Sequence, residues 1–200
     1  MTADLRRHSP AAERNRGPIL QQLQRLLPPT GVALEIASGT GQHAAYVAAA
    51  LAGWRWWPTD FDAGALASID AWCEGLANVS PAWALDVMAP LWPGVPATVD
   101  AVLCANMLHI APWPCCGALM QGAARHLAPD GLLLTYGPYL EDGVPTSDGN
   151  RAFDADLRAR DPQWGLRRLA DVAQQAQAAG LHLHERIAMP ANNLLLVWRR

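Results

Sequence analysis

Short hydrophobic runs alternate along the chain with segments in which hydrophobic residues recur every three or four positions. The runs are typical of buried strands, and we expect strands over residues 32–36, 55–59, 83–85, 99–105, 132–136, 181–187 and 193–198. Helical spacing, bounded by glycine and proline, predicts helices over residues 18–27, 42–51, 63–75, 115–127, 153–160 and 169–179. Strands that alternate with helices predict a mainly parallel sheet with helices on both faces.

The last two expected strands break this alternation. Only residues 188–192 separate them, whereas a parallel crossover needs about a dozen residues. We therefore expect an antiparallel C-terminal hairpin. The whole pattern predicts a single α/β domain with a Rossmann-like, doubly wound sheet of seven strands.

One domain accounts for residues 14–200, because the pattern shows no internal repeat and no second core. Residues 1–13 are polar and charged, and we expect them to form a flexible N-terminal arm that carries Arg6 and Arg7. Residues 137–165 are rich in glycine, aspartate and proline and lack strong periodicity. They are expected to form a lid or part of a binding pocket.

The chain has 200 residues and a net charge of −3, and all 15 positive residues are arginine. Without lysine it cannot form a Schiff base, anchor pyridoxal phosphate or build a P-loop phosphate site. The mild negative charge argues against nucleic acid as the main partner.

The location of the protein is predicted from its cysteines and its hydrophobic stretches. The four cysteines lack C-x-x-C spacing, so we expect free thiols in a reducing compartment, which predicts a cytoplasmic location. Residues 1–17 lack the pattern of a secretory signal, and the apolar run 44–52 is too short to span a bilayer. We therefore expect no membrane partner.

A glycine-containing turn follows the first expected strand, in the segment LEIASGTGQH. Gly39 and Gly41 allow a tight turn and close approach to a ligand, and the following helix presents free N–H groups. Asp60 lies 19 residues after Gly41, at the end of the next strand, where a carboxylate can accept hydrogen bonds from both hydroxyls of a ribose. Turn and acid together predict an adenosine site. The alternative for Asp60 is a helix N-cap, for which Asp62 is better placed.

The same segment resembles the E/D-x-G-x-G-x-G turn of class I methyltransferases, which use S-adenosylmethionine. Glu35 stands at the acidic position, and Ala37 replaces the first glycine, where alanine predicts ordinary backbone angles. Asp86, followed by Val87, resembles the acid after the third strand of that family, which contacts the adenine amino group; the alternative is a helix cap. The C-terminal hairpin resembles the antiparallel seventh strand of the family, which NAD-binding Rossmann domains lack.

A closer resemblance extends from about Arg14 to Arg200. It rests on the segments ERNRGPIL, LEIASGTGQH, DVMAPLWP, NMLHIAPW, LLLTYGPY, FDADLRARDPQWGLR and MPANNLLLVWRR. These segments are similar to those of the DUF938 family, whose animal member is called methyltransferase-like 26. The resemblance implies a class I methyltransferase fold and S-adenosyl-L-methionine as the cofactor, and it implies no particular substrate.

Further cofactor-binding candidates lie in the turn and after the fourth expected strand. Ser38 and Thr40 are expected either to bond the carboxylate of the cofactor or to cap the turn. Glu35 is expected to orient the turn or to reach the amino end of the cofactor. Asn106 and Met107 follow the strand 99–105, at the edge where open α/β sheets bind ligands, and they are expected to contact the cofactor.

Three residues near the same edge are candidates for catalysis. His109 can act as a general base because an imidazole titrates near neutrality, or it can be a structural histidine. Tyr136 and Tyr139 are expected either to orient a substrate or to pack at the rim. The histidines and cysteines lack metal-ligand spacing, so no metal site is expected.

Family motifs outside the core give candidates for substrate binding, since polar loop residues are often functional. These candidates are Arg14, Asn15, Asn150 and Trp164. Together the features favour an S-adenosylmethionine-dependent methyltransferase that transfers a methyl group in line to an unidentified small-molecule acceptor. The alternatives are a module that binds S-adenosylmethionine or its demethylated product without turnover and, less favoured, an NAD-binding oxidoreductase. The sequence predicts no oligomeric state.

Overall fold

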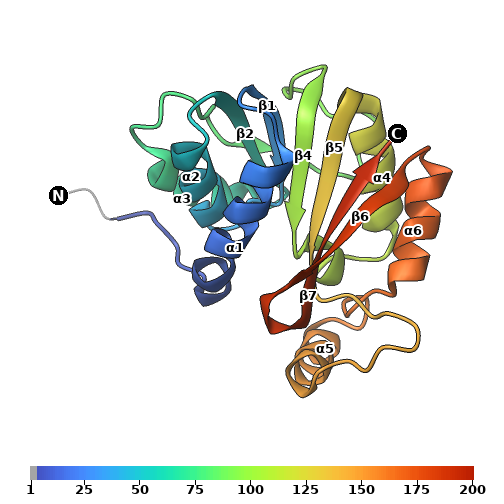
Figure 1. The fold of residues 1–200 in the computed structure, drawn as a ribbon. Helices are drawn as coiled ribbons and strands as arrows, with labels where there is room; N and C mark the ends of the chain where they lie inside the picture. Colours follow the sequence, from blue (N-terminus) through green and yellow to red (C-terminus); the bar gives the residue numbers. More distant parts are fainter. Residues whose placement is uncertain (1–3) are drawn as a thin grey trace.

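The structure is a computed structural model that describes residues 4–200, and these residues form one mixed sheet of seven strands (Figure 1). The strands lie in the order β3-β2-β1-β4-β5-β7-β6. Their bounds are β1 Gly31–Ile36, β2 Trp54–Asp60, β3 Trp83–Ala84, β4 Val99–Ala105, β5 Leu127–Gly137, β6 His182–Met189 and β7 Asn193–Arg199. β1 to β5 pair in parallel, and β7 lies antiparallel between β5 and β6. The predicted Rossmann-like sheet and its antiparallel hairpin are confirmed.

Helices cover both faces of this sheet. They are α1 Pro10–Leu26, α2 Gln42–Ala50, α3 Ala63–Cys73, α4 Pro114–His126, α5 Asp148–Arg160 and α6 Leu169–Ala178. Figure 1 shows α1, α2 and α3 on one side of the sheet and α4 and α6 on the other, with α5 beside the turn between β6 and β7. None of the helices in residues 4–200 combines the length and the apolar character that a membrane span needs.

Two hydrophobic layers hold the helices to the sheet, because successive strand residues point to opposite faces. In β5, Leu133 belongs to the layer under α4 and α6, and Leu134 belongs to the layer under α1, α2 and α3. Trp54 and Trp56 of β2 are fully buried in the second layer. This packing fixes the ends of the strands, where the polar turns begin.

The helix α1 begins at Pro10 instead of the expected residue 18, which corrects the extent of the predicted arm. The Ser9 hydroxyl caps the helix by accepting a hydrogen bond from the Ala12 N–H at 3.3 Å. Pro10 occupies the first turn, where a missing N–H removes no helical hydrogen bond. Pro18, expected as the first residue of the helix, lies inside it. Residues 10–13 are therefore helical, and only residues 4–9 of the described chain before α1 are irregular.

Candidate functional site

A cavity of about 710 Å³ opens at the carboxyl ends of β1, β2, β3 and β4. The lining residues that the sequence predicted are Gly39, Thr40, Asp60, Asp86, Val87, Met107 and Trp164. Lining residues that it did not single out include Arg7, Ile36, Phe61, Leu85, Met88 and Ile110. Because open parallel sheets bind ligands at this edge, the cavity is the candidate functional site.

The turn between β1 and α2 forms one wall of the cavity, and its backbone is left-handed at three positions. The φ angles are +56° at Ala37, +60° at Gly39 and +90° at Gly41. The expectation of ordinary angles at Ala37 is therefore wrong. The Ser38 N–H donates to the Thr59 carbonyl at 2.8 Å, which fixes the chain directly after Ala37. A left-handed alanine costs about 1–2 kcal/mol, so the rest of the turn determines its conformation.

Asp60 lies at the end of β2, and its carboxylate holds the turn. Oδ2 accepts a hydrogen bond from the Gly39 N–H at 2.8 Å, and Oδ1 accepts one from the Asp62 N–H at 2.9 Å. An ionised carboxylate offers about four acceptor positions, so Asp60 can still accept hydrogen bonds from a ligand. Asp62 is the N-cap of α3, since its Oδ1 accepts from the Gly64 N–H at 2.8 Å. The N-cap alternative for Asp60 is thereby removed.

The charged side chains around the cavity are mostly acidic. Of the described residues that line it, Asp60, Asp62 and Asp86 carry carboxylates and Arg7 alone carries a guanidinium. Asp86 follows β3, and its Oδ1 accepts from the Met88 N–H at 2.8 Å. Within residues 4–200, no three His, Cys, Asp or Glu side chains are grouped as metal ligands. This charge pattern suits a ligand that carries cationic, hydroxyl and amino groups.

Glu35 lies under the turn and is not among the described residues that line the cavity. Its side chain is 2% exposed, and Oε2 accepts a hydrogen bond from Trp56 Nε1 at 2.5 Å. Its carbonyl accepts from the Thr59 hydroxyl at 2.7 Å. Burial raises the pKa of Glu35 to about 7, against a smaller lowering by the Trp56 hydrogen bond. These contacts join β1 to β2 and favour the turn-orienting interpretation of Glu35.

Replacing Glu35 by glutamine is expected to stabilise the protein more as the pH rises. Between pH 4.5 and about 7 the unfolded chain loses the Glu35 proton before the folded protein does, so the contribution of Glu35 to the free energy of unfolding falls with pH. The Glu35→Gln variant does not titrate there and retains a Trp56 acceptor. Relative to wild type, its free energy of unfolding should rise by about 3 kcal/mol from pH 4.5 to 8, as measured by urea denaturation.

The control is Glu74→Gln, the same chemical change at an exposed position after α3. Its free energy of unfolding should differ from wild type by less than about 0.5 kcal/mol, the range of ordinary surface substitutions. A Glu35→Gln difference that stays constant over this pH range would show that the folded protein ionises Glu35 as readily as the unfolded chain.

Besides Glu35, three predicted cofactor residues lie outside the described lining. Ser38 is buried, and Gly41 is the N-cap of α2. Asn106 has a left-handed φ of +64°, which asparagine tolerates, and its N–H donates to the Tyr136 carbonyl at 2.8 Å. In this structure these residues shape the turn and the end of β4.

The three candidates for catalysis are buried and lie on two faces of the sheet. The rings of His109 and Tyr139 are in edge contact, 4.9 Å between centroids, on the face covered by α4. Tyr136 points to the opposite face, toward α1. Burial lowers the pKa of His109 to about 3 and raises the pKa of Tyr136. None of the three is among the described residues that line the cavity.

The four candidates for substrate binding are also not brought together. Asn15 Oδ1 lies 2.6 Å from Nε2 of His43 in α2, and Arg14 is exposed on α1. Asn150 lies in α5, and its Nδ2 donates to the Asn192 carbonyl at 2.8 Å, which attaches α5 to the turn between β6 and β7. Of the four, Trp164 lines the cavity. It is the part of the segment 137–165 that reaches the site.

Three solved structures with a similar fold are named as methyltransferases. CalO1, a methyltransferase in calicheamicin biosynthesis in its SAH-bound form, has a TM-score of 0.74 and 18% identity and covers 94% of this chain. The mitomycin 7-O-methyltransferase MmcR has a TM-score of 0.80 and 18% identity, and the match covers 95% of this chain. The third structure is an O-methyltransferase family 2 protein from Planctomyces limnophilus in complex with apigenin. It has a TM-score of 0.73 and 18% identity, and the match covers 95% of this chain. The matches cover 54% of CalO1, 54% of MmcR and 60% of the third protein.

The chain therefore has the fold of the S-adenosylmethionine-dependent methyltransferases, over little more than half the length of these neighbours. Residues 6–200 match the family described as "Protein of unknown function (DUF938)". The chain belongs to this family, which confirms the resemblance seen in its sequence.

Proposed function

We propose that this protein is an S-adenosylmethionine-dependent methyltransferase that acts on a small-molecule acceptor. The observation that carries the proposal is the cavity at the ends of β1 to β4, with Asp60 and Asp86 at two successive strand ends and the glycine turn beside them. The proposal is supported by the fold that the chain shares with known methyltransferases.

The residues of the cavity fit S-adenosylmethionine chemically. Asp60 has acceptor positions left for the ribose hydroxyls, and Asp86 can accept from the adenine amino group. Leu85, Val87 and Ile110 give apolar surface for the purine ring. When bound, the cofactor supplies a methyl group on a positively charged sulfur. The acidic lining complements this charge.

The protein's own contribution is to hold the reactants and exclude water. The turn that carries Gly39 and Thr40 is fixed by hydrogen bonds to β2, which keeps the cavity wall in one position. Such positioning and desolvation account for most of the barrier reduction when the leaving group is already good. For an acceptor that must lose a proton, His109 is not proposed as the base, because it is fully buried outside the described lining of the cavity and its lowered pKa of about 3 makes it a weak base.

A small molecule fits the cavity better than a polymer. Its volume of about 710 Å³ lies within the range of small-molecule sites. Its charged lining is three carboxylates against one guanidinium among the described residues, which disfavours a nucleic acid. Phe61 is exposed at the cavity and supports an acceptor with an apolar surface.

Two measurements test the proposal. Titration calorimetry should show binding of S-adenosylhomocysteine and no binding of NAD. Incubation with S-adenosylmethionine labelled in the methyl group and a small-molecule extract should give a labelled product. Binding of NAD without S-adenosylhomocysteine would overturn the proposal in favour of an oxidoreductase. Tight binding of S-adenosylhomocysteine with no labelled product from any of a broad set of extracts would favour the module without turnover.

A further inference from the structure

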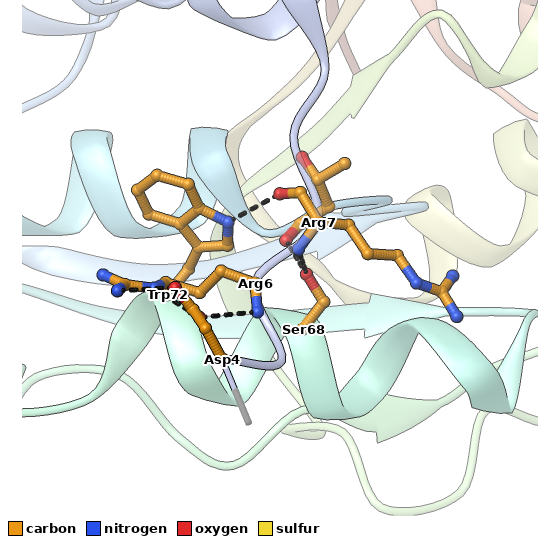
Figure 2. A network of polar contacts seen from close by, with 6 residues as sticks. Asp4, Arg6, Arg7, Ser68 and Trp72 are labelled. Carbon is orange, nitrogen blue, oxygen red and sulfur yellow. Dashed lines mark hydrogen bonds and ion pairs between the residues drawn. The ribbon is translucent and has the colours of Figure 1, made fainter. Parts of the chain in front are cut away.

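Residues 4–9, which we call the docked segment, have no helix or strand but are attached to α3 (Figure 2). The Arg7 N–H donates to the Ser68 hydroxyl at 2.8 Å, and Trp72 Nε1 donates to the Arg7 carbonyl at 2.8 Å. The His8 ring stands edge-on to Trp72, with 5.1 Å between centroids. Both backbone groups of Arg7 are thus fixed by a helix more than sixty residues away in the sequence.

The docked segment is also connected to the glycine turn. The Ser68 hydroxyl that accepts from Arg7 donates in turn to the Thr40 carbonyl at 2.7 Å. The Ser9 N–H donates to Gln42 Oε1, 2.5 Å away, and Thr40 Oγ1 lies 3.0 Å from the same oxygen. The position of the docked segment is therefore coupled to a wall of the cavity.

Arg6 and Arg7 are neighbours whose side chains leave the docked segment in opposite directions (Figure 2). The Arg6 guanidinium pairs with Asp4 at 2.9 Å and lies 5.6 Å from the Trp72 ring centre. Arg7 lines the cavity, and its guanidinium lies 3.5 Å from the Asp62 carboxylate. Exposed pairs of this kind contribute little, so the Arg7 guanidinium is free to turn its donors toward a ligand.

We propose that Arg7 is a cofactor-binding residue that donates hydrogen bonds to the ribose oxygens of S-adenosylmethionine, in partnership with Asp60. The inference rests on the proposed function. A ribose hydroxyl can donate to a carboxylate and accept from a guanidinium at the same time, and Asp60 and Arg7 both line the cavity. The Asp62 N–H donates to Asp60 while the Asp62 carboxylate pairs with Arg7, so a single residue links them.

Arg7→Ala and Arg6→Ala form a matched pair that tests this assignment. Both variants remove one positive charge from adjacent exposed residues, and only Arg7 lines the cavity. Calorimetry with S-adenosylhomocysteine should show a Kd about 10- to 100-fold higher for Arg7→Ala, the loss of one charged hydrogen bond, and a change below about twofold for Arg6→Ala. Equal effects of the two variants would overturn the role of Arg7.

A second probe, adenosine, shows which part of the cofactor Arg7 contacts. Because adenosine keeps the ribose and lacks the amino-acid portion, a ribose contact predicts the same fold-loss for adenosine as for S-adenosylhomocysteine. A loss confined to S-adenosylhomocysteine would place the guanidinium at the carboxylate and overturn the ribose assignment. If wild-type protein bound neither ligand, the proposed function would fail together with this inference. If it bound both and Arg7→Ala had no effect, only the inference would fail.

Hydrogen–deuterium exchange gives a readout that does not depend on catalysis. In the wild-type protein, S-adenosylhomocysteine should slow exchange of the amides of residues 5–8, because a ligand held by Arg7 stabilises the docked segment. Trp72→Phe keeps an aromatic ring beside His8 and removes the hydrogen bond to the Arg7 carbonyl. In the Trp72→Phe variant, the amides of residues 5–8 should exchange faster than in wild type without ligand, and S-adenosylhomocysteine should bind more weakly. Identical exchange of residues 5–8 with and without saturating ligand would contradict the proposal.

Discussion

Replacing Asp60 by alanine is expected to weaken the binding of S-adenosylhomocysteine by at least about 100-fold. On the proposed function, the carboxylate accepts hydrogen bonds from two ribose hydroxyls, and each charged hydrogen bond contributes about 1.5–3 kcal/mol. The variant also loses the acceptor for the Gly39 and Asp62 N–H groups, which loosens the turn that forms the cavity wall. Calorimetry with S-adenosylhomocysteine measures the loss directly.

Two further variants separate the ligand contact from the effect on the turn. Asp60→Asn keeps one acceptor oxygen for the turn and loses the charge, so we expect it to bind more weakly than wild type and more tightly than Asp60→Ala. Asp130→Ala removes the same charge at an exposed position of β5 and should bind like wild type. The ribose-binding role of Asp60 would be contradicted if Asp60→Ala kept wild-type affinity while its thermal unfolding without ligand showed a folded protein.

The sequence predicted strands well where they are buried along their whole length. It predicted helix ends well only where the capping signal is strong. The run VDAVLCA predicted β4 over residues 99–105, as observed, because a strand covered on both faces is almost continuously apolar, and Asp100 is the one charged residue of this run. The start of α1 was predicted too late because Pro18 is a common first residue of helices. Ser9 and Pro10 are also a helix-start signal, a capping serine followed by proline. It was missed because the residues after it are polar and show no hydrophobic periodicity.

Residues of the candidate site were predicted where they directly follow a strand, and missed where long-range packing places them. Asp60 and Asp86 lie at strand ends, so topology alone brings them to one edge. Tyr136 and Tyr139 were grouped because they are close in sequence, but they belong to opposite hydrophobic layers of the sheet. Arg7 was missed because its partners lie in α3, and no periodicity in a polar segment of six residues indicates such a contact.

The two glycines of the turn are expected to differ sharply when each is replaced by alanine. Both have positive φ, +60° at Gly39 and +90° at Gly41, so each alanine has a cost of about 1 kcal/mol or more from the backbone alone. A Cβ at Gly39 would have no atom within 4 Å from beyond its two chain neighbours, whereas a Cβ at Gly41 would lie 2.6 Å from the Ile69 Cα. That contact is with backbone and cannot be relieved by turning a side chain.

We therefore expect Gly41→Ala to lower the free energy of unfolding by at least about 3 kcal/mol and Gly39→Ala by about 1 kcal/mol. Urea denaturation with an unchanged m-value measures both, and Gly39→Ala is the control for the backbone term. Losses that agree within about 0.5 kcal/mol would mean that α3 moves away from α2 at little cost. The contact with Ile69 also displaces its neighbour Ser68, which holds the Arg7 N–H. We therefore expect faster hydrogen exchange of the amides of residues 5–8 in Gly41→Ala than in wild type.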